Sequence, residues 1–127
     1  MTAVHKRAKA SRARIDQELP HQVALQDDLC VGRNYGLIAS FCEEHGLDCE
    51  TRPITMRFSD GKCDHYRLHC FATPEAASLF MRTFGGELFN PRTDRGRGPL
   101  KNSWTRDFPW RRFVDSGPLR VPDDLIR

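Results

Sequence analysis

Residues 64–89, DHYRLHCFATPEAASLFMRTFGGELF, decide the fold because they have the pattern of a strand, a helix, a double-glycine stop and a second strand. Thr73 can cap the free N–H groups of the first helical turn, and Pro74 suits the first helical position because its missing N–H is not needed there. Gly85 ends the helix. Apolar residues recur along one helical face, at Ala77, Phe80, Met81 and Phe84. This spacing predicts a helix whose apolar face packs on a core.

The residues before this stretch predict a β-hairpin with a definite register. Residues 50–58 alternate in polarity, and a three-residue loop of Ser59, Asp60 and Gly61 follows, with Gly61 in the left-handed conformation. This loop places Ile54 opposite Tyr66, whereas a two-residue turn would mix apolar and polar residues on each face. One face then holds Ile54, Met56, Phe58, Tyr66, Leu68 and Cys70. The other holds Thr55, Arg57, Cys63, His65, Arg67 and His69, and we expect it to be the open, polar side of the sheet.

The remaining elements complete a βαββαβ order. Residues 21–26 read as a strand, residues 34–45 as a helix ended by Gly46, and residues 87–89 as a short strand stopped by Asn90 and Pro91. The order predicts a single α+β domain of ferredoxin-like type, an antiparallel sheet with two helices on one face. We assign residues 1–20 to a basic N-terminal arm or helix, residues 21–90 to the α+β domain, and residues 91–127 to an Arg/Trp-rich, partly ordered C-terminal tail.

Composition limits the class of protein. A chain of 127 residues is long enough to bury a core as one domain, and it has no apolar run of membrane-spanning length. The basic N-terminus lacks the apolar segment of a secretory signal. Five cysteines are an odd number without framework spacing, so we expect free thiols and a cytoplasmic protein with no membrane partner.

Charge is distributed unevenly along the chain. Residues 1–20 carry five basic and two acidic residues, residues 21–90 carry six and ten, and residues 91–127 carry nine and five. The arms are therefore basic and the central domain is acidic. This asymmetry points to an anionic partner for the arms, or to arms that fold back on the domain.

The C-terminal tail mixes arginine with aromatic residues. Arginine neutralises phosphate groups and aromatic rings stack on unpaired bases, so the mixture suits single-stranded nucleic acid. We therefore expect a non-enzymatic binding module for an anionic partner, nucleic acid foremost. The residues expected to bind the anion or nucleic acid are Arg57, His65, Arg67 and His69 on the sheet and Arg95, Arg97, Lys101, Trp104, Arg106, Trp110, Arg111 and Arg112 in the tail.

Two other interpretations remain open for the same residues. Tryptophans usually bury most of their area, so the aromatic tail can dock on its own core or on a second subunit, which would make the protein an interaction or self-assembly module. Cysteine and histidine occur at Cys42, His45 and Cys49 and again at residues 63–70, but neither group has the spacing of a zinc knuckle. We assign no catalytic residue, no metal and no cofactor.

Three short segments resemble a family of small uncharacterised bacterial proteins with no known activity. The segments are His-Gln-Val-Ala-Leu at residues 21–25, Phe-Gly-Gly-Glu at residues 84–87 and Arg-Gly-Arg-Gly at residues 95–98. The resemblance extends over residues 20–112, rests on these short motifs, and implies no catalytic residue.

Overall fold

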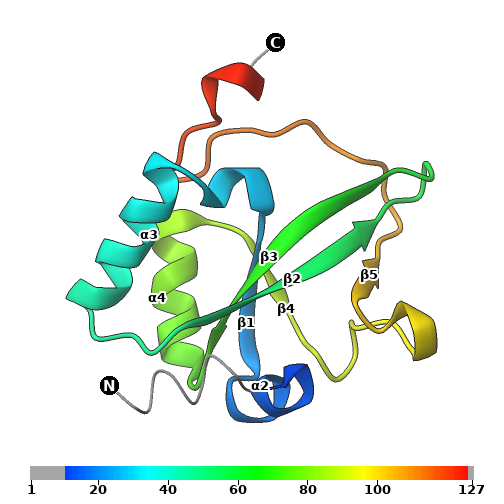
Figure 1. Ribbon diagram of the computed structural model, residues 1–127, viewed down its shortest axis with the longest axis horizontal. Coiled ribbons are helices and arrows are strands. Elements are labelled where there is room, and N and C mark those ends of the chain that lie inside the picture. Colours follow the sequence, from blue (N-terminus) through cyan, green and yellow to red (C-terminus); the bar gives the residue numbers. More distant parts are fainter. Residues whose placement is uncertain (1–10, 126–127) are drawn as a thin grey trace.

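The computed structural model describes residues 11–125 of the chain (Figure 1). Residues 1–10 of the predicted basic arm lie outside the described residues. The elements, in chain order, are α2 (Arg12–Glu18), β1 (His21–Gln26), the 3-10 helix η1 (Asp27–Cys30), α3 (Arg33–Glu44), β2 (Glu50–Arg57), β3 (Cys63–Phe71), α4 (Pro74–Phe84), β4 (Glu87–Phe89), η2 (Gly98–Leu100), β5 (Ser103–Thr105) and η3 (Asp123–Leu125). In this described part, no helix is long and apolar enough to cross a membrane.

Helix ends form where the sequence places their signals. The Thr73 side chain accepts a hydrogen bond from the Ala76 N–H, and Pro74 begins α4. At the end of α3, the Gly46 N–H donates to the Glu43 carbonyl (3.1 Å) and the Leu47 N–H donates to the Cys42 carbonyl (2.8 Å). These two bonds, with Gly46 at a φ of 63°, form a Schellman motif.

The sheet has five strands in the order β4-β1-β3-β2-β5, and it curves into a half-barrel (Figure 1). Neighbours among β1 to β4 are antiparallel, whereas β5 is parallel to β2. The hairpin register is as predicted, with Ile54 opposite Tyr66. The prediction of a ferredoxin-like domain with an all-antiparallel sheet is wrong, because three residues of the tail add a parallel strand and because both faces of the sheet are covered.

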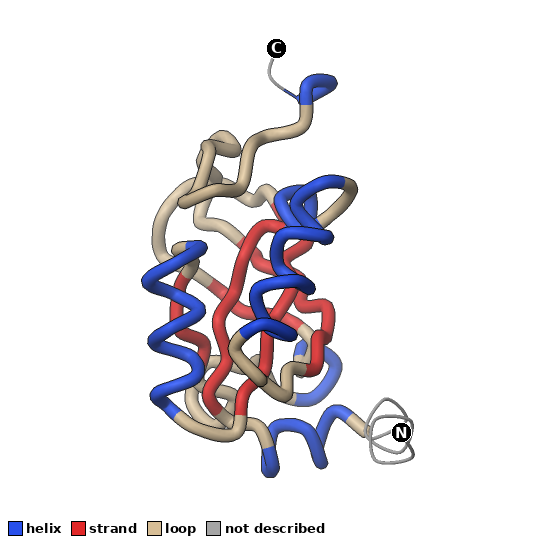
Figure 2. The backbone as a smooth tube through the Cα atoms, turned by 90° about the vertical axis from the view of Figure 1, so that its left-hand side faces the viewer, coloured by secondary structure: helices blue, strands red, loops and turns tan. Residues whose placement is uncertain are grey.

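Two separate cores lie on the two faces of the sheet. The first contains Ile54, Met56 and Leu68, and it is covered by Ile15 of α2 and by Leu19, which follows the helix. The second contains Val23, Leu25 and Phe71, and it takes in residues of both α3 and α4, among them Ile38, Ala77, Phe80 and Phe84. Figure 2 shows α3 and α4 in front of the strands.

The helices therefore cover the face that the sequence predicted to be open and polar. Val23 pairs with His69, and Leu25 pairs with Arg67, so β1 contributes apolar side chains to the same face as these two polar residues. These apolar side chains allow the apolar face of α4 to pack there, and His69 is only 2% exposed as a result. The prediction of a solvated face at His69 is wrong for this reason.

The segment after β4 packs on the first core. Trp104 is 8% exposed and meets Phe89 edge to face at 5.0 Å between ring centroids. The Trp110 indole N–H donates to Asp64 (2.9 Å). Arg95 forms two hydrogen bonds of 3.0 Å to the carboxylate of Asp16, which joins this segment to α2.

Candidate functional site

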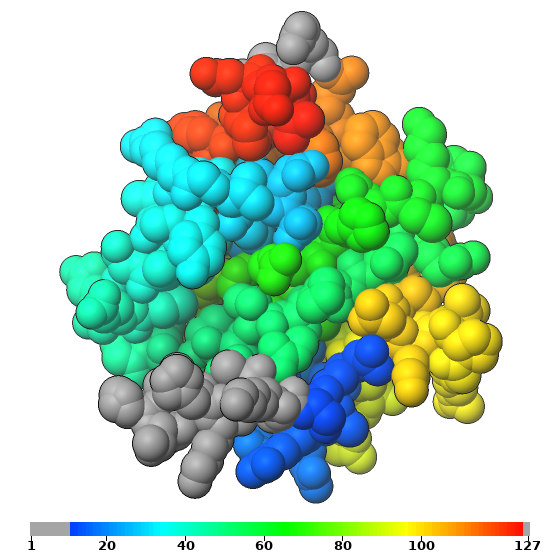
Figure 3. Space-filling view, viewed as in Figure 1, coloured from blue at the N-terminus to red at the C-terminus, as the bar shows by residue number. Residues whose placement is uncertain are grey.

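A cleft of about 730 Å³ lies between α3 and the strands β2 and β3. The surface is hollowed where the cyan residues of α3 meet the green strands (Figure 3). Helix α3 contributes Tyr35, Ile38, Ala39 and Cys42, the strands contribute Glu50, Thr51, Arg67 and His69, and the neighbouring loops and η1 contribute Cys30, Val31, Gly32 and Cys49. We call this feature the α3 cleft.

The position of α3 is fixed at both ends. At its start, the Asn34 side chain donates to the Arg120 carbonyl (2.8 Å) and accepts from the Arg120 N–H (3.2 Å), so the C-terminal segment holds the helix. Gly32, at a φ of 60°, allows the sharp turn from η1 into the helix. At its end, the Schellman motif turns the chain back toward β2. The wall of the cleft is therefore held by backbone geometry and by a buried side chain.

His69 is the buried polar group of the cleft. Its ring stacks on Phe80 with a centroid distance of 4.8 Å, and its Nδ1 has no hydrogen-bond partner among the described residues. Burial lowers the pKa of His69 to about 4, against the opposing effect of backbone hydrogen bonds from the imidazole to Val23 and Arg67. His69 is therefore a neutral imidazole at pH 7 with one unsatisfied nitrogen.

Arg67 is the cation of the cleft. It lies two residues before His69 on the same face of β3, roughly 7 Å away along the strand. Its Nε donates to the Asp27 carboxylate (2.8 Å), and its Nη1 makes a long contact of 3.5 Å to the Thr51 hydroxyl. No described residue accepts a hydrogen bond from Nη2. About a third of the side chain is exposed, so the guanidinium can bind an incoming anion.

The rim of the cleft is apolar. Tyr35 is 66% exposed and Val31 is 47% exposed, and both line the opening. They are two of the five large hydrophobic residues exposed in the described part of the chain, so this surface concentrates apolar side chains in contact with water. Such a rim favours an apolar ligand, because binding would remove this area from water.

Residues 42–49 contribute two thiols to the wall. Cys42 and Cys49 share a hydrogen bond that lowers the pKa of Cys42, and the same bond together with burial raises the pKa of Cys49. Cys30 differs, because burial raises its pKa to about 12.

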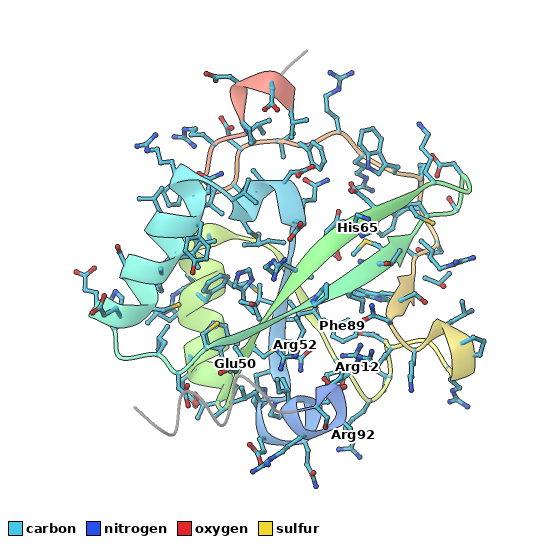
Figure 4. All side chains as sticks on the ribbon, viewed as in Figure 1. Arg12, Glu50, Arg52, His65, Phe89 and Arg92 are labelled. Atoms are coloured by element: carbon cyan, nitrogen blue, oxygen red, sulfur yellow. The ribbon has the colours of Figure 1, made fainter. Side chains whose placement is uncertain are left out.

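The residues predicted from sequence to bind an anion fall into three groups. Arg67 and His69 lie in the α3 cleft. Arg57 and His65 are exposed in the half of the hairpin nearer its tip, and Figure 4 shows His65 far along the hairpin from Glu50. The tail residues lie by the hairpin, β5 and α2, so the twelve residues form no single site.

The tail residues divide again by exposure. Arg106 lies over the rings of Trp104 (4.1 Å) and Phe108 (4.5 Å) and forms an ion pair with Glu87, so its charge is compensated within the fold. The charge of Arg95 is compensated in the same way by its ion pair with Asp16. Of the basic tail residues that we predicted to bind an anion, Arg97, Lys101, Arg111 and Arg112 are exposed.

Sequence reasoning missed most of the cleft. Tyr35, Ala39 and Asp27 were not assigned to a site, because none belongs to a motif and the partners come from separate elements. The signal that was present is the pair Arg67 and His69 at strand alternation.

No family model matches this chain, and no curated protein or solved structure is significantly similar to it. The fold and the cleft define a small α+β domain with a ligand-sized hollow between α3 and the strands β2 and β3.

Proposed function

We propose that this protein binds a small, mainly apolar molecule with one carboxylate in the α3 cleft. The observation that supports this most is the unpartnered Nδ1 of His69 in a residue only 2% exposed. An unsatisfied buried polar atom costs about 1–3 kcal/mol, and a second polar group of the ligand that hydrogen-bonds it would recover this free energy. A buried, polar, perturbed group in a mostly apolar hollow is typical of ligand sites.

The size and lining of the cleft support a small organic ligand. A volume of about 730 Å³ falls within the range of drug-sized pockets. The wall is apolar along α3, with Ile38 and Ala39 facing it, and the polar groups are few. This arrangement favours a ligand whose body is hydrocarbon or aromatic and whose polar groups are at fixed positions.

The charges favour a monoanion. Arg67 is the only cation among the described residues that line the cleft, and Asp27 already compensates part of its charge. A dianion such as a phosphate monoester would face a single guanidinium already shared with Asp27, so its second charge would find no partner among the described lining residues. A carboxylate needs only the free face of one guanidinium, with which it forms charge-assisted hydrogen bonds.

The test is a binding titration of the purified protein with straight-chain carboxylates of increasing length and with aryl carboxylates. The matching alcohols serve as uncharged probes. We expect carboxylates to bind more tightly than the alcohols, and Arg67→Gln to weaken them about tenfold or more, since a hydrogen bond to a charged group contributes about 1.5–3 kcal/mol. Arg57→Gln, at an exposed arginine outside the cleft, should leave affinity unchanged.

A second pair of variants separates the cleft from the rest of the surface. Ala39→Phe places a ring in the cleft, whereas Ser40→Phe places the same ring on the next exposed residue of α3. We expect the first to abolish binding and the second to preserve it. Equal behaviour of the two variants, or no carboxylate binding by the parent protein, would disprove the proposal.

Nucleic acid remains a second candidate because of the exposed basic residues beside the hairpin. Lys62 lies over the Trp110 ring (5.2 Å), Arg111 lies over Phe108 (4.7 Å), and Arg57 pairs with Thr105 in the adjoining strand. Titration with labelled single-stranded and duplex oligonucleotides at several salt concentrations tests it. Phosphate contacts strengthen as salt falls, so a lack of binding at low salt excludes this function. We also propose a cytoplasmic location, supported by five cysteines that are all free thiols.

A further inference from the structure

Three of the five cysteines line the α3 cleft, and two of them contact each other. Cys42 lies in the last turn of α3 and Cys49 comes just before β2. Each thiol shifts the pKa of the other, which places the two side chains within interaction range, and the Cys49 thiol also donates to the Glu50 carbonyl (3.7 Å). Both residues are half-buried. Cys30 and Cys70 are buried, and Cys63 is exposed on the hairpin. The Cys42–Cys49 pair therefore combines mutual contact with access from solvent.

The backbone holds Cys42 and Cys49 at the two ends of one short, fixed loop. The Schellman motif at the end of α3 ties the Leu47 N–H to the carbonyl of Cys42 itself (2.8 Å). Cys49 is only two residues beyond Leu47, and its neighbour Glu50 pairs with Cys70 in the sheet. The loop is thus fixed to the helix at one end and to the sheet at the other.

The two thiols are chemically unequal. The hydrogen bond from Cys49 lowers the pKa of Cys42, with burial acting partly against it. The C-terminal end of a helix disfavours an anion, so α3 itself does not stabilise the Cys42 thiolate. The stabilisation therefore comes from Cys49. Burial raises the pKa of Cys30 and of Cys70 to about 12, so neither competes with Cys42 for the first attack on peroxide.

We infer that Cys42 and Cys49 are a redox-active pair that hydrogen peroxide converts into an intramolecular disulfide. The Cys42 thiolate attacks one peroxide oxygen and breaks the O–O bond, which gives a sulfenic acid at Cys42 and, after proton uptake, one water. The Cys49 sulfur then attacks the Cys42 sulfur and expels the sulfenic oxygen as a second water. Two thiols lose two electrons and two protons in total, and peroxide is reduced to two waters.

Disulfide formation would also alter the proposed ligand site, because both sulfurs belong to its wall. This consequence rests on the proposed function, and we expect the reduced and oxidised proteins to bind carboxylates with different affinities. The covalent chemistry does not depend on any ligand. The modification is therefore tested first, on the protein alone, and failure to bind carboxylates would leave it standing.

The experiment uses the full chain, reduced and then freed of reductant, and treated with increasing hydrogen peroxide. Intact mass should fall by two hydrogen atoms per chain before oxygen adducts appear, and added dithiothreitol should restore it. Digestion after glutamate cleaves at Glu43 and Glu44, between the two cysteines. The two peptides that contain Cys42 and Cys49 should then remain joined until reduction.

Matched variants identify the residues. Cys42→Ser and Cys49→Ser should each abolish the mass loss, whereas Cys63→Ser, at the exposed cysteine, should leave it intact. Cys49→Ser should also keep Cys42 more reactive toward iodoacetamide than Cys49→Ala does, because only serine retains a donor for the thiolate. The peptide map of the unmodified protein decides the question even where a variant folds poorly. The inference is refuted if Cys63 forms oxygen adducts while Cys42 and Cys49 stay reduced, or if the linked peptides contain another pair.

Discussion

The buried imidazole of His69 should make the stability of the protein depend on pH in a specific window. Its pKa is about 4 in the folded chain, against the ordinary histidine value of 6.5 in the unfolded chain. Between these values the unfolded state binds more protons than the folded state, so stability rises with pH. The contribution of the neutral His69 imidazole to the free energy of unfolding is complete above pH 6.5 and is lost progressively as pH falls toward 4.

The size of the effect follows from the same two values. At about 1.36 kcal/mol per pKa unit, the full loss is roughly 3 kcal/mol, and about 1.4 kcal/mol of it should be gone at pH 5.5. Other groups titrate in this range, so the quantity to measure is the difference between the parent protein and His69→Gln, which cannot titrate. Common contributions cancel in that difference.

Urea unfolding followed by tryptophan fluorescence at pH 7.5, 6.5, 5.5 and 5.0, spanning the histidine window, gives the free energies. We expect the parent protein to lose stability relative to His69→Gln by about 1.4 kcal/mol on going to pH 5.5. His65→Gln, the same substitution at an exposed histidine, is the matched control. The reasoning fails if the difference between parent and His69→Gln stays constant with pH, or if the His69 ring is seen by NMR to titrate near 6.5 in the folded protein.

Three further changes test how the chain is held together, each by urea unfolding at neutral pH. Arg95→Gln should lower the free energy of unfolding by about 3 kcal/mol, because it removes the nearly buried ion-pair partner of Asp16. A decrease of less than about 1 kcal/mol would contradict this. Gly86→Ala should cost more than Gly61→Ala, since both have positive φ but only at Gly86 would a Cβ lie 2.7 Å from a backbone carbonyl; equal losses would oppose the assigned packing. Trp104→Ala should lower the free energy of unfolding by about 3–5 kcal/mol if β5 belongs to the core. An unchanged unfolding midpoint would show that this segment does not contribute to the core.

Local sequence was sufficient to predict most of the helices and strands and the register of the hairpin. Helix α4 begins and ends where Thr73, Pro74 and Gly85 indicate, because capping depends on residues within one turn. The hairpin loop set which residues of β2 and β3 face each other, because a turn of given length allows one register.

Local sequence did not determine what covers each face of the sheet. Apolar residues occur on both faces once β1 is inserted, and Val23 beside His69 shows that a strand distant in sequence supplies the missing hydrophobic area. The assignment of the helices to a face therefore depends on pairing over more than forty residues. From the alternation within the hairpin alone, we expected the helices to cover the face that holds Ile54 and Met56 and to leave the face of His69 open.

The tail illustrates the same limit. Ser103, Trp104 and Thr105 are too few to show a strand period, and they form β5 because β2 presents an open edge to them. Arginines that suggested a charged surface for phosphate are in part used by Asp16 and Glu87 within the fold. A charge pattern gives the sign of a surface only when the partners of each charge are known.

The sequence by itself determined the helices, the main strands and the hairpin register, because these follow from caps, turns and periodicity over short spans. It also placed Arg67 and His69 on one side of a strand. Only the tertiary structure brought α3 against that strand, buried the His69 ring under α4 and set the Cys42 and Cys49 thiols in the same wall. Both candidate sites depend on contacts between separate elements, and such contacts are made by long-range packing.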